Sequence, residues 1–326
     1  MFKIVSDEKE IERLHSIFSQ KMESHLTEIM HVYIGYKGEN KLLDVSYSSD
    51  LNIWWTFQRL SDRHWNSFGV GIPSRKSNNS ITCEINYSFQ GFNTSLAGGF
   101  AANEEGEVIL IHSGRIGGGR KGIGKTLFTD NYIGEIVPVK FKNNVSEYAP
   151  IGSFDSVRFG SQVALFVHEI SRIKELSKNI HTPSRVDTIK NGIKTTFNKE
   201  FAGEKEVKQR ERSIAICDHG LIVNGYKRIL EQKGEIVAND RERDLYIISK
   251  DRINTVFEFK TNYDRQSIYT GIGQLLLNNR IFNPAPRMVL SLPVGLSEDF
   301  KRVINSLAIE ILEYQWKNNK TLEFLI

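Results

Sequence analysis

The sequence is poor in cysteine and contains no long apolar run. Cys83 and Cys217 are the only cysteines in 326 residues. Two thiols are too few for a disulfide framework, and they have no second pair with which to form a zinc site. We therefore expect two reduced thiols in a cytoplasmic protein. No segment approaches about 18 uninterrupted apolar residues, which excludes a membrane-spanning helix.

The sequence also lacks a strong charge of one sign and an apolar N-terminal segment. Its 43 Lys and Arg against 39 Asp and Glu give a net charge of +4. This mild basic balance permits a nucleic-acid partner without arguing for one. The opening stretch MFKIVSDEKE places acidic side chains where a secretory signal would be apolar, so no such signal is expected.

The first half of the chain has the pattern of a β-rich domain. Residues 7–29 space apolar side chains at intervals of three and four, which predicts an amphipathic helix. From residue 31 to about 150, short runs rich in Val, Ile, Tyr, Phe and Trp alternate with Gly, Asn, Ser and Asp. These runs predict a mainly antiparallel β domain, which we place at residues 1–155.

The second half changes to a mixture of helices and strands. Residues 161–180 predict a second amphipathic helix, and residues 156–200 are interpreted as this helix and a polar linker. The remaining residues, 201–326, predict a helix ended by Gly234, strands at 235–239, 244–249 and 255–261, a helix at 264–279, a strand at 287–292, a helix at 297–316 and an edge strand at 321–326. This order predicts a mixed α/β sheet covered by helices, and the whole chain is assigned to the mixed, α+β class.

Acidic and basic residues in two of these strands have a chemical rationale. Asp244 opens one strand, and Glu258 and Lys260 lie two residues apart in the next. Because side chains alternate along a strand, Glu258 and Lys260 share one face, and Phe257 and Phe259 share the other. If the strands pair as a hairpin, Asp244 lies beside Glu258. Two carboxylates suit Mg²⁺, and a neighbouring lysine can orient or help to deprotonate a water molecule.

This pattern resembles the PD-(D/E)XK nuclease superfamily over roughly residues 205–315. The preceding helix, the later helix with Gln274, and the strand RMVLSL fit the same pattern. The resemblance implies a restriction-endonuclease-like fold that cleaves DNA, less often RNA, with Mg²⁺ or Mn²⁺. It also implies that Asp244 and Glu258 bind the metal while Lys260 and Gln274 complete the site. A restriction or phage-defence enzyme acting as a homodimer is the expected biology.

The sequence departs from the family pattern before the aspartate, where NDRER replaces Pro-Asp. Asp240 is therefore an alternative to Asp244. The resemblance also implies an acidic residue on the first core helix, which Glu211 could supply, and His219 lies near the start of that helix. Capping by Asp218 and a packing role for His219 are the competing interpretations.

The segment GRKGIGKT, residues 119–126, matches the phosphate-loop pattern G-x-x-x-x-G-K-[ST]. An ATP-binding loop needs a strand that ends at its first glycine and a helix that begins at its lysine. The strand EVILIH ends several residues before Gly119, and few residues remain after Thr126 for a helix. IAICD, ending at Asp218, is the only candidate for the strand that would bind magnesium. An NTPase therefore remains an alternative. We favour a basic loop that binds DNA phosphates through Arg115, Arg120, Lys121 and Lys125.

Aromatic residues in NIWWTFQRLSDRHWNSF lie among basic side chains. Trp54, Trp55 and Trp65 could stack on bases, although core packing would produce the same letters. The sequence thus predicts a two-domain DNA endonuclease with N-terminal recognition. A non-catalytic nucleic-acid-binding protein with a degenerate nuclease fold is the main alternative.

Overall fold

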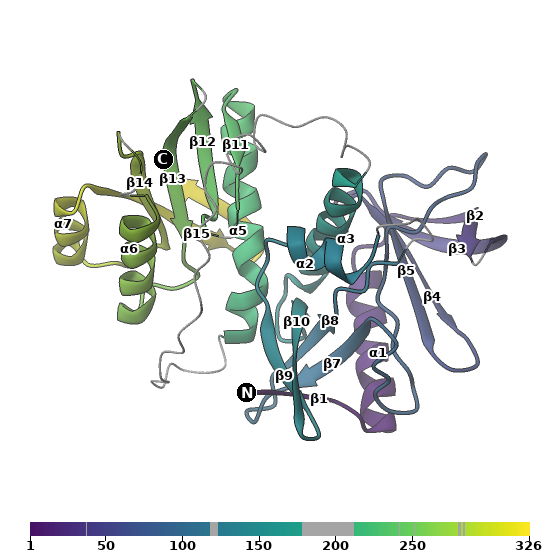
Figure 1. Ribbon diagram of the computed structural model, residues 1–326. Helices are drawn as coiled ribbons and strands as arrows, with labels where there is room; N and C mark the ends of the chain where they lie inside the picture. The colour runs from purple at the N-terminus through teal and green to yellow at the C-terminus, as the bar shows by residue number, and fades with distance from the viewer. Residues whose placement is uncertain are drawn as a thin grey trace. The chain divides into compact units, whose positions relative to one another are not determined.

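A computed structural model describes residues 1–36, 38–117, 123–177, 212–240, 242–250, 252–279, 282 and 284–326. Across these residues the protein is a mixed α/β structure with six helices and three sheets (Figure 1). The chain divides into two compact units. Unit 1 is Met1–Ile180 with Gln209–Cys217, and unit 2 is His181–Lys208 with Asp218–Ile326. None of the described helices combines the length and apolarity needed to cross a membrane.

Unit 1 contains a closed barrel and a separate five-stranded sheet. The barrel order is β1 (Phe2–Ile4), β7 (Gly98–Ala102), β8 (Val108–His112), β10 (Asn144–Ser153) and β9 (Val137–Phe141). The sheet order is β2 (Glu28–Tyr36), β3 (Glu39–Ser48), β4 (Ile53–Arg59), β5 (His64–Val70) and β6 (Cys83–Glu84). Every pairing is antiparallel except that of β1 with β9. The expectation of a mainly antiparallel β region is confirmed.

Three helices accompany these strands. In α1 (Glu8–Glu23), the Asp7 side chain caps the helix by accepting the Glu10 N–H at 2.9 Å. In α3 (Phe159–Leu176), one face is buried with α1 and with strands of both sheets, and α2 (Lys125–Asn131) buries Phe128 in the same core. The helix that the sequence placed in a connecting segment is thus part of the core of unit 1.

Unit 2 is built on one six-stranded sheet. Its order is β11 (Ile236–Ala238), β12 (Leu245–Ser249), β13 (Arg252–Phe259), β14 (Arg287–Pro293), β15 (Ile309–Lys317) and β16 (Thr321–Leu325). The β13–β14 and β14–β15 pairs are parallel, whereas the other three pairs are antiparallel. The sheet is therefore mixed, as expected, and β16 is an edge strand.

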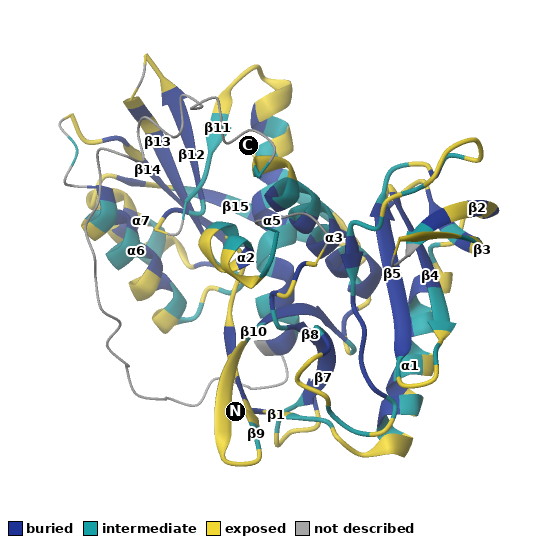
Figure 2. Ribbon diagram, turned by 45° about the vertical axis from the view of Figure 1, so that its right-hand side comes forward, coloured by how far each residue is buried: buried dark blue, intermediate teal, exposed yellow. Residues whose placement is uncertain are grey.

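Helices cover both faces of this sheet (Figure 1). From α5 (Arg212–Gln232), Ile222 and Tyr226 pack with Phe257 and Phe259 on one face. On the other face, α6 (Arg265–Asn279) and α7 (Glu298–Ser306) contribute side chains to a second core. Figure 2 shows the central strands buried between these helices. The alternation predicted for β13 is observed, because the two phenylalanines face away from the α6 side.

The helix predicted at residues 297–316 is wrong in its second half. α7 ends at Ser306, Ala308 has a positive φ of 59°, and β15 begins at Ile309. A left-handed residue interrupts a helix because L-residues disfavour that conformation within one. The segment then pairs in parallel with β14, so that tertiary pairing outweighs the local helical spacing.

Candidate active site

Four of the predicted site residues come together in unit 2, where β12 begins and β13 ends. Leu245 pairs with Phe257 in the antiparallel β12–β13 ladder, so Asp244 lies one residue beyond that pair, next to the end of β13. Glu258 is near the end of β13, which ends at Phe259, and Lys260 is the first residue after this strand. Gln274 reaches the same place from α6 through its contact with Lys260.

Lys260 is the centre of the hydrogen-bond network. Its Nζ donates to Oε1 of Glu258 and to Oε1 of Gln274, both at 2.7 Å. Its backbone is also fixed, because its N–H donates to the carbonyl of Ser291 at 2.9 Å and its carbonyl accepts from Tyr314 Oη at 2.8 Å. The side chain of Glu258 is 4% exposed and that of Lys260 is 17% exposed. The lysine is thus held by neighbours on four elements, β13, α6, β14 and β15, with only limited access to solvent.

Asp244 is held by different partners. Its Oδ2 accepts from the Phe259 N–H at 2.8 Å and lies 3.2 Å from Nε2 of His219. The same nitrogen of His219 lies 3.2 Å from the Phe259 carbonyl. Because both of these neighbours are acceptors, Nε2 must carry a hydrogen. His219, which the sequence offered as an additional site residue, therefore joins α5 to the end of β13 and orients Asp244.

The pKa values of the two carboxyl groups are shifted in opposite directions. Burial, reinforced by the negative charge of Asp244, raises the pKa of Glu258 to about 7, against the opposing effect of Lys260. Burial also raises the pKa of Asp244, but its net pKa is lowered because the attraction of His219, its hydrogen bonds and the charge of Lys260 outweigh burial. Neighbouring acids with separated pKa values are typical of functional sites.

A glycine that sequence reasoning missed shapes the site. A Cβ at Gly271 in α6 would lie 2.6 Å from Cδ1 of Leu290 and 3.2 Å from Cε of Lys260. The absence of a side chain there lets α6 approach the lysine closely. A Cβ at Gly273, by contrast, would meet nothing within 4 Å. In the sequence, the signal for this close approach is the presence of Gly271 and Gly273 within a predicted helix, just before Gln274.

The other acidic candidates have structural roles or lie elsewhere. Asp240 accepts from the backbone N–H of Glu242 and Arg243 and pairs with the buried Arg243 guanidinium at 2.8 Å, so it stabilises the turn before β12. The geometry therefore favours Asp244 over Asp240 as a metal ligand. Asp218 is buried within α5, which begins at Arg212, so it does not cap that helix. Glu211 lies outside the described residues.

The carboxylates are compatible with Mg²⁺. Within the described ranges, no group of three or more His, Cys, Asp and Glu side chains could hold a metal ion. Mg²⁺ does not require such a group, because it commonly binds one or two carboxylates and completes its shell with water and substrate phosphate. The hydrogen bonds of the site engage Oδ2 of Asp244 and Oε1 of Glu258. Among the described residues, these hydrogen bonds leave Oδ1 of Asp244 and Oε2 of Glu258 for another ligand.

The phosphate-loop pattern lacks its required context. β8 ends at His112, seven residues before Gly119, and α2 is a helix of only seven residues that begins at Lys125. IAICD is helical rather than a strand, which removes the proposed magnesium-binding strand of an NTPase. Among the predicted DNA-contacting residues, Arg115 and Lys125 are exposed in unit 1, whereas Arg120 and Lys121 lie outside the described residues.

The proposed base-stacking role of the tryptophans is contradicted. Trp54, Trp55 and Trp65 are at most 2% exposed in unit 1. Trp54 packs so closely over Gly69 that a Cβ there would overlap its indole ring. Large aromatic side chains contribute most by burial, and these three belong to the core of the β region.

No protein-family model matches the chain, and the comparisons with curated proteins and with solved structures also find no match. The geometry of the site is therefore the basis for assigning a function.

Proposed function

We propose that the protein is a Mg²⁺-dependent endonuclease of the PD-(D/E)XK type that hydrolyses DNA phosphodiester bonds. The observation that carries the proposal is the Lys260 ammonium held between Glu258 and Gln274, beside Asp244. The element order α5, β11, β12, β13, α6 and β14 supports it. Asp244 directly precedes β12, Glu258 lies in β13 with Lys260 directly after that strand, and Gln274 lies in α6, which is the order of the superfamily pattern.

Each side chain has a defined role in this proposal. Asp244 and Glu258 would hold Mg²⁺, or Mn²⁺, through the oxygens that the internal hydrogen bonds leave available. The ion would supply charge stabilisation at the phosphate and an activated water molecule. Lys260 would orient that water through its ammonium group, and Gln274 would keep the lysine in position. His219 would keep Asp244 in place.

The remaining assignments belong to the same proposal. Unit 1 would recognise DNA, with Arg115 and Lys125 contacting backbone phosphates, since both are exposed cations. Cleavage of both strands of a duplex by one type of site favours a homodimer. The biological setting would be restriction or phage defence.

A cleavage assay tests the central claim. Plasmid, methylated and phage DNA are incubated with the protein in Mg²⁺, in Mn²⁺ and in EDTA. We expect metal-dependent nicking or linearisation, and Lys260→Ala should slow it by at least about a hundredfold, the usual effect of removing a preorganised hydrogen-bond donor from the reacting groups. Lys233→Ala, at an exposed lysine after α5, is the matched control and should cleave normally.

The outcomes separate the proposal from its alternatives. Failure on every substrate, together with no Mg²⁺ binding by calorimetry, would exclude the nuclease. DNA binding without cleavage would instead support a degenerate, non-catalytic nuclease fold. Loss of ATP binding in Lys125→Ala would support an NTPase, whereas on our proposal this variant weakens DNA binding and reduces its salt dependence.

A further inference from the structure

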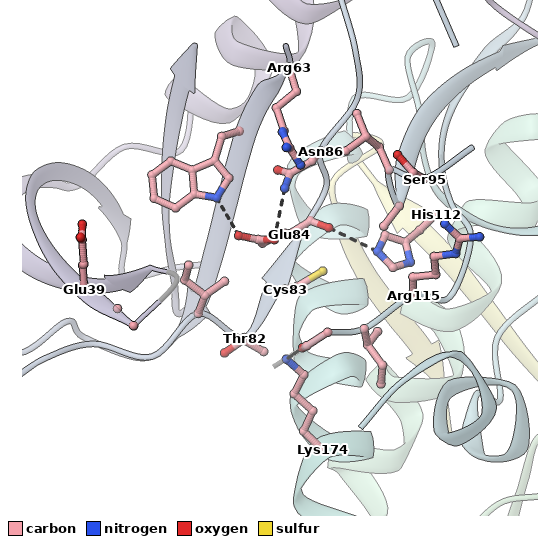
Figure 3. Close-up of a pocket in the computed structure, with 18 of the residues that line it drawn as sticks. Glu39, Arg63, Thr82, Cys83, Glu84, Asn86, Ser95, His112, Arg115 and Lys174 are labelled. Carbon is pink, nitrogen blue, oxygen red and sulfur yellow. Dashed lines mark hydrogen bonds between the residues drawn. The ribbon is translucent and has the colours of Figure 1, made fainter. Parts of the chain in front are cut away.

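Unit 1 contains a cavity of about 720 Å³, and Arg115 is the one lining residue that the nuclease proposal uses. Its walls come from the five-stranded sheet, the barrel and α3, and all of its lining residues belong to unit 1. Figure 3 shows the cavity, with Glu84 near its centre. Cavities of roughly 300–1,000 Å³ with a few placed polar groups are typical of small-molecule sites.

The Glu84 carboxylate is a positioned acceptor in this cavity. Its Oε1 accepts from Nε1 of Trp65 at 2.6 Å, and its Oε2 accepts from Nδ2 of Asn86 at 3.2 Å (Figure 3). An ionised carboxylate offers about four lone-pair positions. Two donors therefore fix the group in place without exhausting its capacity, and a ligand that presents a hydrogen-bond donor would complete it.

The main chain of Glu84 is fixed as well. The Gly114 N–H donates to Nδ1 of His112 at 3.0 Å, so the imidazole hydrogen lies on Nε2, which faces the Glu84 carbonyl at 3.3 Å. Burial lowers the pKa of His112 to about 4, so this ring is neutral at pH 7. Support of both the side chain and the carbonyl of Glu84 is the preorganisation expected of a binding residue.

Basic side chains lie around the same cavity. Arg63, Arg115 and Lys174 line it. Arg63 pairs with Asp62 at 2.9 Å, and Arg115 uses one terminal nitrogen to donate to the Thr94 carbonyl at 2.7 Å. Because a guanidinium carries five N–H donors, each arginine retains donors for an anion. The cavity thus combines an internal acceptor with cations suited to a phosphate.

We infer that this cavity binds a nucleotide whose base carries an exocyclic amino group, with that group donating to Glu84 and the phosphate bound by Arg63 and Arg115. Cytosine fits, because its N4 amino group is a donor, whereas thymine presents a carbonyl oxygen at the same position. A carboxylate would repel that oxygen. The same chemistry can come from a free nucleotide or from one nucleotide unstacked from a strand.

Binding measurements on the full chain in EDTA test this inference without cleavage. Fluorescence anisotropy compares short single strands containing only cytidine or only thymidine, and calorimetry compares dCMP with dTMP. We expect the cytidine strand to bind roughly tenfold more tightly, as a good base contact provides. Glu84→Gln should remove most of this preference. The control Glu39→Gln, at an exposed carboxylate that lines the same cavity, should retain it.

A second variant and a modified ligand keep the test decisive. Arg115→Gln should weaken both strands equally and reduce the salt dependence of binding. If Glu84→Gln does not fold, dCMP with a dimethylated N4 amino group is compared with dCMP on the unaltered protein. Loss of binding on dimethylation supports the contact with Glu84, because the donors have been removed.

The outcomes are distinct from those of the nuclease proposal. If cytidine is preferred both as dCMP and in the strand, a free nucleotide is sufficient for binding. If it is preferred only in the strand, the ligand is one nucleotide unstacked from a strand. Both results support the inference. Equal binding of cytidine and thymidine, no binding of either, or an unchanged preference in folded Glu84→Gln would overturn it. Because cleavage depends on Asp244 and Glu258 in unit 2, either proposal can fail while the other stands.

Discussion

Replacement of Glu258 by glutamine should stabilise unit 2 at alkaline pH. The carboxyl group is buried beside Asp244, and both factors raise its pKa to about 7. Glutamine keeps an Oε1 acceptor for Lys260 but removes the charge that is poorly solvated there. The variant should therefore gain stability only above about pH 4.5, where the unfolded side chain is ionised, and the gain should be complete above about pH 7.

The size and pH range of the effect follow from linkage. In the unfolded chain Glu258 ionises near its ordinary value of 4.5, whereas the folded protein retains the proton up to about pH 7. Stability from this group is fully present below pH 4.5 and is lost as the pH rises to about 7. At about 1.4 kcal/mol per tenfold change in proton affinity, the loss is about 3 kcal/mol. Because the new amide also needs a partner, we expect Glu258→Gln to gain about 1–3 kcal/mol at pH 8.

Hydrogen exchange measured on peptides from β12 and β13 reports this local stability. It is compared at pH 5 and pH 8 in EDTA, after correction for the intrinsic exchange rate. The gain should be present at pH 8 and nearly absent at pH 5, and Glu235→Gln, at an exposed carboxylate after α5, should change neither value. Equal or lower protection of the variant at pH 8, or the same gain at both pH values, would refute the reasoning.

Three further predictions concern packing and metal binding. Gly271→Ala should slow cleavage and leave unit 2 no more stable, because a Cβ would press on Leu290 and Lys260. The matched variant Gly273→Ala should preserve activity and add up to about 1 kcal/mol to the unfolding free energy measured in urea, because a Cβ there meets nothing within 4 Å. Gly69→Ala should lower the urea stability of unit 1 by about 1–3 kcal/mol, because the buried Trp54 ring cannot move aside. Mg²⁺ at ten times its Kd should raise the exchange protection of β13 by about 1.4 kcal/mol in the native protein and much less in Glu258→Gln; equal protection of both proteins would contradict metal binding at this residue.

Much of the arrangement of unit 2 could be predicted from sequence because local patterns determine it. The alternation along β13 separates Glu258 and Lys260 from Phe257 and Phe259, and the short connection after β12 imposes the antiparallel pairing that brings Asp244 alongside. The error at residues 297–316 arose where the apolar spacing fits both a helix and a strand. Only the neighbouring β14 and the left-handed Ala308 select the strand.

Contacts between distant segments could not be predicted, even where the residue itself was a candidate, as His219 was. His219 reaches Asp244 across 25 residues, and the cavity of unit 1 gathers side chains from β5, β6, β8 and α3. The burial of the three tryptophans could not be predicted either, because a half-buried and a fully buried indole have the same local sequence pattern. Asp240 was ambiguous for a related reason. Its buried partner Arg243 is three residues away in sequence, but that arginine also donates to Oδ1 of Asn279 in α6, 36 residues away.

The energetic arrangement of the site supports catalysis over a purely structural role. A buried ion pair is usually replaceable by apolar side chains with no loss of stability, so the Glu258–Lys260 pair is not required to hold the sheet together. The pair also lies beside a second carboxylate, which raises the pKa of Glu258 further. A fold that needed only a cross-link between β13 and α6 would gain nothing from that repulsion. A metal ion bound by both carboxylates would relieve the repulsion between Asp244 and Glu258. The proposed Mg²⁺ site therefore explains why the two carboxylates lie together, which packing alone does not.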